Sequence, residues 1–201
     1  MKITKFSFPI LLTSILCLTS FSDVASFAST VKQDGTVKVK DSGITPPIDP
    51  ENPDKEVDPD GPDQKVKGSL RIDFSSTLDF GSVQIGSKNR KYDSRAQLFL
   101  DDTEARGNYV QITDAREEST GWTLQMEQTK QFTDSKGNEL TGATLSYDKA
   151  WANASHKTPE ITPDVTRETL SLVPGEAAII AKAKENTGWG VWTIEFGASA
   201  N

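Results

Sequence analysis

The segment Gly121-Trp122-Thr123-Leu124-Gln125-Met126 gives the most direct indication of the fold, because apolar and polar side chains alternate along it. Successive side chains of a β-strand point to opposite faces, so Trp122, Leu124 and Met126 share one face. This row predicts a half-buried strand whose apolar face packs against a core.

The same period of two recurs from residue 68 onward. The alternating rows are Leu70, Ile72 and Phe74 (with Arg71 and Asp73 on the opposite face); Leu78 and Phe80; Val83 and Ile85; Val110 and Ile112; Leu145 and Tyr147; Leu170 and Leu172; and Trp192, Ile194 and Phe196. Gly, Asn, Asp and Ser separate the rows, which predicts an all-β fold, an antiparallel β-sandwich or a barrel-like domain. The range from Gly175 to Asn186 contains a stretch of mixed propensity at 177–181, and we predict a strand with a turn over this range.

Residues 1–28 have the three parts of a secretory signal peptide. Lys2 and Lys5 form a short positive region, residues 6–18 are apolar, and the small residues Ser26 and Ala28 follow. The apolar run is shorter than the ~20 residues that a membrane-spanning helix needs. We therefore expect a secreted protein that is cleaved after Ala28 and has no membrane span.

Composition excludes several classes of function. The formal net charge is −7, which disfavours nucleic acid and anionic lipid as partners. The only cysteine, Cys17, lies within the predicted signal peptide, so we expect a mature domain without disulfides. His156 is the only histidine, which leaves no usual ligand set for zinc and no Ser-His-Asp triad with a nucleophile elbow. The carboxylate pairs at 101–102 and 117–118 are adjacent and point to opposite faces of a strand. We predict no cofactor, no metal and no enzymatic activity.

A proline-rich, acidic stretch precedes the alternating rows. Residues 41–67 hold six of the ten prolines and no aromatic side chain. Such a stretch buries too little surface to offset its ordering entropy, so we predict a solvated spacer, with a long loop inside the domain as the alternative. Ahead of it, the segment 29–40 includes Thr36-Val-Lys-Val-Lys40, which alternates like one short strand. Residues 68–201 are predicted to form the β domain.

Several segments, read together, resemble one known family. Gly121-Trp122-Thr123-Leu124 is similar to the Trp-x-Leu signature of WxL domains, which are surface modules of low-GC Gram-positive bacteria. Further segments that resemble the family, in family order, are Leu70–Phe74, Leu78–Gly81, Tyr109–Asp114, Glu139–Ala143 and Gly188–Trp192. The likeness covers nearly all of residues 36–197, and this combination is more specific than a single Trp-x-Leu.

The resemblance implies a β-rich, non-enzymatic module that attaches non-covalently to peptidoglycan at the cell wall surface. It also implies complexes with other WxL proteins and with WxL-interacting proteins. The alternative is a structural subunit that binds protein partners rather than peptidoglycan. Family domains carry a second Trp-x-Leu in a last strand after the segment that Phe196-Gly197 resembles. On this alignment the chain is expected to lack the final strands.

Four residues are candidates for binding a ligand or partner: Trp122, Leu124, Trp151 and Trp189. Trp122 and Leu124 belong to an apolar row, so a place in the core is favoured over a contact surface. Trp151 lies in a predicted loop, and Trp189 follows Thr-Gly, so neither has alternating partners. These two are the better candidates for exposed rings, which can stack on the C–H-rich faces of sugars.

Overall fold

The computed structural model describes residues 43–62, 66–82 and 90–198, and every regular element in these residues is a β-strand. The strands are β1 (Leu70–Ser75), β2 (Asn108–Asp114), β3 (Trp122–Glu127), β4 (Ser146–Tyr147), β5 (Ala150–Asn153), β6 (Asp164–Val165), β7 (Leu170–Ser171), β8 (Ala177–Ala183) and β9 (Gly190–Phe196). All their pairings are antiparallel, so the predicted all-β fold is confirmed. The predicted signal peptide at 1–28, the strand segment at 29–40 and the row at Val83 and Ile85 lie outside the described residues.

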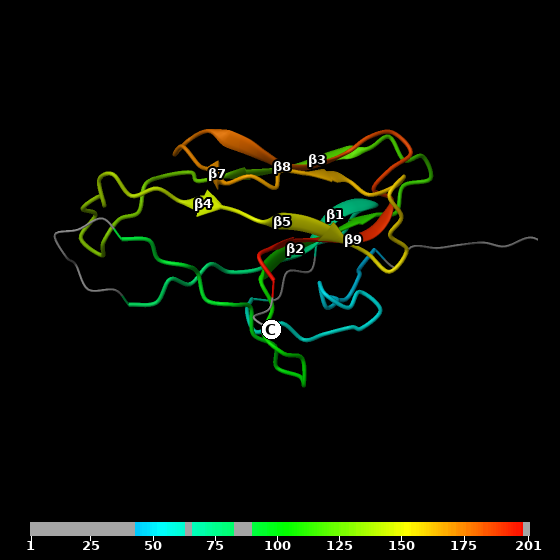
Figure 1. Cartoon of the computed structure of the whole chain (residues 1–201), viewed down its shortest axis with the longest axis horizontal. Helices are drawn as coiled ribbons and strands as arrows, with labels where there is room; N and C mark the ends of the chain where they lie inside the picture. Colours follow the sequence, from blue (N-terminus) through cyan, green and yellow to red (C-terminus); the bar gives the residue numbers. More distant parts are fainter. Residues whose placement is uncertain (1–42, 63–65, 83–89, 199–201) are drawn as a thin grey trace, which may run out of the picture. The chain divides into compact units, whose positions relative to one another are not determined.

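Two sheets carry the core. The large sheet has four strands in the order β1-β2-β9-β5, and the small sheet has three in the order β3-β8-β6. Figure 1 shows β3 and β8 in an upper layer and β2, β5 and β9 in a layer below it. One hydrophobic cluster contains buried side chains from both sheets, which therefore pack face to face as a β-sandwich. β4 and β7 form a separate two-stranded ribbon.

The core between the sheets consists of the alternating rows of the sequence. Trp192 and Ile194 of β9 have no exposed surface, and they share a cluster with Trp122 and Leu124 of β3. Burying one large apolar side chain contributes about 1.5–3 kcal/mol, against about 0.5–1.5 kcal/mol for a hydrogen bond. The apolar rows, more than the backbone ladder, therefore fix which face of each strand points inward.

β1 departs from its predicted alternation. Its pairing with β2 shifts register between Ile72 and Phe74, which is the mark of a β-bulge. The extra residue reverses the side-chain alternation that follows it. Leu70 and Ile72 point toward the small sheet as predicted, but Phe74 lies on the opposite face and stacks on Tyr109, with ring centroids 4.8 Å apart. The prediction of one continuous apolar row is therefore wrong for Phe74.

β8 confirms the strand predicted between Gly175 and Asn186, and a turn at 185–186 follows it. The mixed pattern reflects a second irregularity, because the pairing with β3 shifts register between Leu124 and Gln125. Ile180 and Ala181, adjacent in the sequence, are both buried. A bulge within the strand explains two consecutive buried side chains.

The face of the large sheet that points away from the small sheet is polar and yet buried. Its buried polar side chains are Arg71, Asp73, Gln111, Thr113, Thr193 and Glu195. Arg71 Nε donates to Asp73 Oδ1 at 2.8 Å, and Thr113 Oγ1 donates to Asp73 Oδ2 at 2.6 Å. Residues 43–62, which we call the proline-rich strap, lie below this face in Figure 1 (cyan). A buried polar group is stable only when it has a hydrogen-bond partner, so the strap must supply polar contacts.

Side chains of β2 and β5 hold the proline-rich strap. The bonds join Thr45 Oγ1 to Thr113 Oγ1 (2.9 Å), the Ile48 N–H to Gln111 Oε1 (2.8 Å), Gln111 Nε2 to the Pro46 carbonyl (3.0 Å), and Asn153 Nδ2 to the Pro50 carbonyl (2.8 Å). The first three bonds involve Thr113 and Gln111 of β2, and the last involves Asn153 of β5, on the far side of β9 in the sheet order. The strap therefore crosses the sheet, and its backbone carbonyls and N–H groups are used as partners.

An ion pair adds to this docking. Arg106 donates from Nε and Nη2 to both carboxylate oxygens of Asp49, each at 2.9 Å, and Asp49 is 2 % exposed. Burial alone would raise the pKa of Asp49, but the hydrogen bonds and charge of Arg106 hold that pKa below its ordinary value. The bidentate geometry fixes the position of the strap at Asp49 and favours the ionised form of this carboxyl group.

The prediction of a solvated spacer is thus wrong for residues 43–62, which are bonded to the large sheet. The prediction assumed that a segment without aromatics must bury its own surface. The strap instead binds to a sheet that is already formed, and its prolines lower the entropy lost on ordering. Ile48 and Val57 are buried at 9 % and 8 % exposure.

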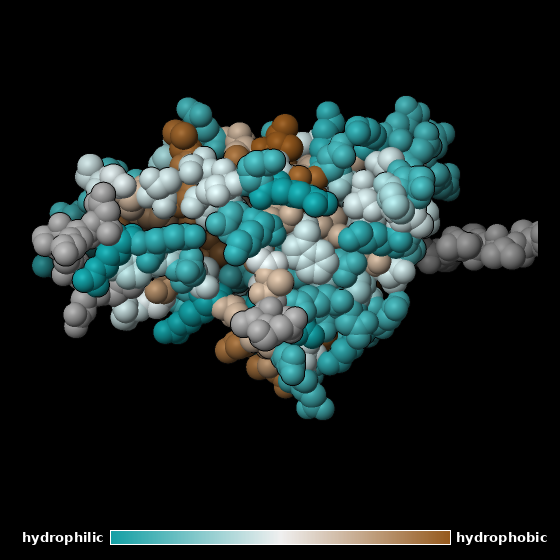
Figure 2. Space-filling view, viewed as in Figure 1, coloured by the Kyte–Doolittle hydropathy of each residue, from teal (hydrophilic) through white to brown (hydrophobic). Residues whose placement is uncertain are grey.

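The surface visible in Figure 2 is mostly hydrophilic, with hydrophobic residues in small separate groups. In the parts of the chain that the structure describes, no helix has the length and apolarity to cross a membrane.

Candidate functional site

Trp189 is the exposed member of the four candidate residues. It directly precedes β9, and its side chain is 44 % exposed. The ring of His156 stacks on it, with centroids 4.5 Å apart and planes 27° apart. One face of the indole is therefore supported by the imidazole, and the rest of its exposed surface is open to a ligand. We call Trp189 and His156 the aromatic platform.

The backbone carbonyl of Trp189 ties the aromatic platform to the core. It accepts hydrogen bonds from His156 Nε2 and from Trp192 Nε1, each at 2.8 Å. A carbonyl oxygen only accepts, so in the neutral imidazole the proton must be on Nε2. Trp192 has no exposed surface. The backbone that carries the solvent-facing Trp189 ring is thus bonded to a tryptophan of the core.

Two glycines make this arrangement possible. Gly188 and Gly190 have φ angles of +67° and +82°, a region that other residues rarely adopt. A Cβ atom on Gly190 would lie 2.7 Å from Cε1 of His156, and one on Gly188 would lie 2.8 Å from Nε1 of Trp122. The Gly-Trp-Gly sequence is therefore required for the turn and for the close approach of both rings.

Trp122 and Leu124 lie in the core, at 8 % and 7 % exposure. The signature tryptophan also reaches the aromatic platform, because its Nε1 donates to the carbonyl of Gly188 at 2.9 Å. The residue that receives this bond directly precedes Trp189. Trp122 therefore combines a packing role with a positioning role, and its ring is not presented to solvent.

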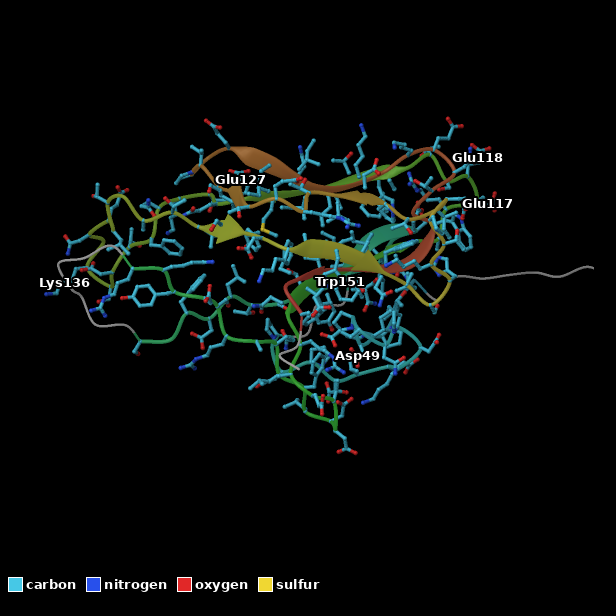
Figure 3. All side chains as sticks on the ribbon, in the orientation of Figure 1. Asp49, Glu117, Glu118, Glu127, Lys136 and Trp151 are labelled. Atoms are coloured by element: carbon cyan, nitrogen blue, oxygen red, sulfur yellow. The ribbon has the colours of Figure 1, made fainter. Side chains whose placement is uncertain are left out.

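Trp151 differs from its prediction. It lies in β5 and not in a loop, and it is half-buried. Its Nε1 donates to the carbonyl of Gly197 at 2.7 Å, and Nζ of Lys157 lies 5.7 Å from the ring centroid. Figure 3 labels its side chain beside the strand. The loop prediction failed because Ala150 and Ala152, which give the strand its inward face, are too small to form a visible apolar row.

One carboxyl group has the perturbed acidity that catalytic acids show. Burial, together with the negative charge of Glu51, raises the pKa of Glu195 to about 8. The side chain of Glu195 has no exposed surface, however, and its Oε1 accepts the N–H of Gly107 at 2.9 Å. A substrate cannot reach it there, so it is a structural acid under the strap. Within the described residues, no group of three or more potential metal ligands comes together.

The sequence interpretation missed His156 as the partner of Trp189, because 33 residues separate them and no period connects a loop to a turn. The available signal was local. A tryptophan between two glycines indicates a tight turn that presents a large ring, and the structure adds the ring that supports it.

The described residues thus form an antiparallel β-sandwich with one exposed aromatic ring beside β9. Comparison with protein families defines it further: the model of the WxL domain, described as surface cell wall-binding, matches residues 26–201. The chain therefore belongs to the WxL family, as its resemblance predicts, and the family places it at the cell surface. Neither the curated proteins nor the solved structures contain a match.

Proposed function

We propose that this protein is a secreted, non-catalytic module that attaches non-covalently to peptidoglycan, and that Trp189 stacks on its glycan. The observation that carries the proposal is the half-exposed Trp189 ring, which His156 supports from one side. An aromatic face attracts the C–H bonds of a sugar ring, and a ring held in place loses little freedom on binding.

The test is sedimentation with purified sacculi. The wild-type protein is expected to pellet alone, and Trp189→Ala is expected to remain in the supernatant while keeping its melting temperature. Tyr92→Ala is the matched control, because Tyr92 is an aromatic residue of similar exposure, 41 %, and belongs to neither ring of the aromatic platform. Equal pelleting of wild type and Trp189→Ala would remove the ring from the proposed contact.

The proposal includes export. Cleavage after Ala28 would leave a mature chain that begins at Ser29. Intact mass of the protein recovered from the cell surface tests this step. An uncleaved chain or a lipid attached to Cys17 would contradict it.

A second candidate function is that of a subunit that binds other WxL or WxL-interacting proteins and not peptidoglycan. Leu98 and Leu100 favour it, because they are 57 % and 69 % exposed on a loop that is fixed to the strap. The N–H of Leu100 donates to the carbonyl of Asp58 at 2.7 Å, and the carbonyl of Leu98 accepts from the N–H of Asp60 at 2.8 Å. Such a subunit would pellet with sacculi only when its partner is added. The double variant Leu98→Ser with Leu100→Ser would then stay in the supernatant even in the presence of the partner.

A further inference from the structure

A groove opens between the proline-rich strap, the loop 98–106 and β1. Figure 1 shows this loop (green) beside the strap (cyan), below the large sheet. The groove has a volume of about 450 Å³, and most of the residues that line it are apolar, among them Ile44, Pro46, Pro59, Val66, Phe74 and Leu100. Ile44, Val66 and Leu100 are 40 %, 50 % and 69 % exposed, so apolar walls face solvent. A concave apolar surface of this size is typical of a binding site.

Hydrogen bonds hold the walls of the groove to one another. The N–H of Val57 donates to the carbonyl of Pro47 at 3.0 Å, and the N–H of Leu100 donates to the carbonyl of Asp58 at 2.7 Å. Phe74, which is 4 % exposed, forms the floor. The prolines have fixed φ angles, so the walls have little further freedom to lose when a ligand binds. The groove is therefore preformed, which lowers the entropic cost of binding.

Exposed carboxylates give the groove a negative rim. They belong to Asp58, which lines the groove, and to its neighbours Asp60, Asp101 and Asp102. Among the described residues, Asp58 and Asp60 have no ion-pair partner. The strap and the loop 98–106 together carry nine acidic and two basic side chains. The surface around the groove is therefore suited to a cationic ligand and repels an anionic one.

A buried carboxylate also lines the groove, but it is already used by the fold. Asp73 is 6 % exposed, and it accepts hydrogen bonds from Arg71 Nε at 2.8 Å and from Thr113 Oγ1 at 2.6 Å. Its charge and its oxygens are satisfied within the protein. Recognition of a cation is therefore left to the exposed carboxylates of the rim.

We propose that this groove binds a basic, amphipathic segment of a partner protein, in which apolar side chains alternate with Lys or Arg. The apolar side chains would cover Phe74 and Leu100, and the basic side chains would pair with Asp58 and Asp60. A second copy of this chain does not fit, because its net charge is −7 and two acidic rims would meet across a two-fold interface. The proposal requires neither the glycan contact of Trp189 nor a partner from the WxL family.

Binding of synthetic peptides, measured by fluorescence polarisation, tests the chemistry of the occupant. The probe is a labelled peptide in which lysine and leucine alternate. Three matched peptides of equal length replace every lysine by glutamate, every lysine by serine, or every leucine by serine. We expect only the lysine–leucine peptide to bind, and more weakly as salt concentration rises. Equal binding of the glutamate–leucine or serine–leucine peptide, or no binding of the lysine–leucine peptide, would overturn the proposal.

Two leucines of the same loop locate the apolar contact. Leu100→Ser should weaken binding of the lysine–leucine peptide about tenfold, which corresponds to the burial of one large apolar side chain. Leu98→Ser is the matched control, because Leu98 is 57 % exposed but does not line the groove, and it should bind like wild type. Equal affinities of these two variants would place the peptide elsewhere and overturn the proposal.

A second pair of variants locates the charge contact. Asp58→Asn with Asp60→Asn should weaken peptide binding about fivefold and reduce its salt dependence. Glu117→Gln with Glu118→Gln removes the same charge at the end of the small sheet, as Figure 3 shows, and should leave binding unchanged. Equal losses in both double variants would mean that net charge and not the rim attracts the peptide, which would contradict the proposal.

Trp189→Ala separates this groove from the proposed glycan contact. It should bind the lysine–leucine peptide like wild type even if it no longer pellets with sacculi. Loss of peptide binding in a Trp189→Ala protein that keeps its melting temperature would show that the peptide uses the aromatic platform, and the groove would then not be its site. The glycan proposal can fail in the sacculus assay without any change in the peptide assay.

Discussion

The two faces of the large sheet are both buried, but by different means. The inward face carries Val110, Ile112, Trp192 and Ile194, which pack against the apolar residues of the small sheet. The outward face carries charged and amide groups that bond to one another and to the proline-rich strap. Apolar packing is non-directional and responds to lost volume, whereas buried polar contacts are directional and respond to a single missing partner.

The outward face also contains the weak points of the fold. Among the described residues, Oε2 of Glu195 and the hydroxyl of Tyr109 are buried without a hydrogen-bond partner. These two residues are paired across β2 and β9. Both face the strap, where Asp49 and Glu51 bring further negative charge. The inward face should therefore respond to changes in side-chain size, and the outward face to charge and pH.

The largest effect is expected on the inward face. Trp122→Ala should lower the free energy of unfolding by about 3–5 kcal/mol, because it leaves a cavity that the packed core cannot fill. Urea denaturation measures it. Trp122→Phe is the companion variant, since it keeps most of the volume and lacks the bond to Gly188, and it should cost much less. A Trp122→Ala protein that unfolds like wild type would contradict the core position of this ring.

A smaller loss is expected when the outward face loses one charge. Arg106→Met should destabilise the protein by about 3 kcal/mol, because Asp49 is left buried without its partner. Trypsin should then cleave at Lys55 in the strap, a site that the docked wild-type strap protects. Adding Asp49→Asn to Arg106→Met removes the uncompensated charge, so the double variant should recover part of the stability and of the protection. Cleavage at Lys55 at equal rates in all three proteins would mean that the ion pair does not hold the strap.

These two faces also show how far the sequence alone predicts the structure. The rows at Trp122, Ile112 and Trp192 were predicted correctly, because the alternation of apolar and polar residues directly indicates which side chains share a face. The β-bulge at Asp73 was not predictable in this way, since one extra residue reverses the faces without any change in composition. The burial of the outward face was missed for a further reason: its polar residues alternate as solvent-facing residues do.

The candidate site was predicted in part. Trp189 stood out as a ring without alternating partners, and the structure exposes it. Its support by His156, and the bond from Trp122 to the preceding glycine, depend on contacts between distant parts of the chain. No local pattern encodes such contacts. Likewise, the strap was interpreted from its own composition, whereas its order comes from the sheet that it covers.

A pH effect of intermediate size is expected at Glu195. The pKa of this carboxyl is raised to about 8 in the folded protein, above its ordinary value, so the folded state retains a proton that the unfolded state has lost. The contribution of Glu195 to stability is therefore greatest in acid and falls as pH rises toward about 8, by at most about 1.4 kcal/mol per pH unit. Glu195→Gln, which keeps an acceptor for the N–H of Gly107, should abolish this slope. Urea midpoints between pH 5 and pH 8 measure it, and an equal slope in both proteins would assign the dependence to other groups.

The smallest effect on stability is expected at Trp189, which belongs to neither buried face. Trp189→Ala should cost about 0.5–1 kcal/mol, the size of one aromatic contact, because the backbone carbonyl that binds His156 and Trp192 remains. Its melting temperature should thus stay close to that of wild type while sacculus binding is lost.

His156→Ala sharpens this last expectation, because it removes the support of the ring and leaves the ring itself. If a fixed ring is needed, His156→Ala should weaken pelleting without abolishing it, since a mobile indole still stacks but loses more freedom on binding. If ring area alone matters, His156→Ala should pellet like wild type. A fall in melting temperature for Trp189→Ala as large as that for Trp122→Ala would show that both tryptophans act through the fold, and the separation of a packing ring from a contact ring would then be wrong.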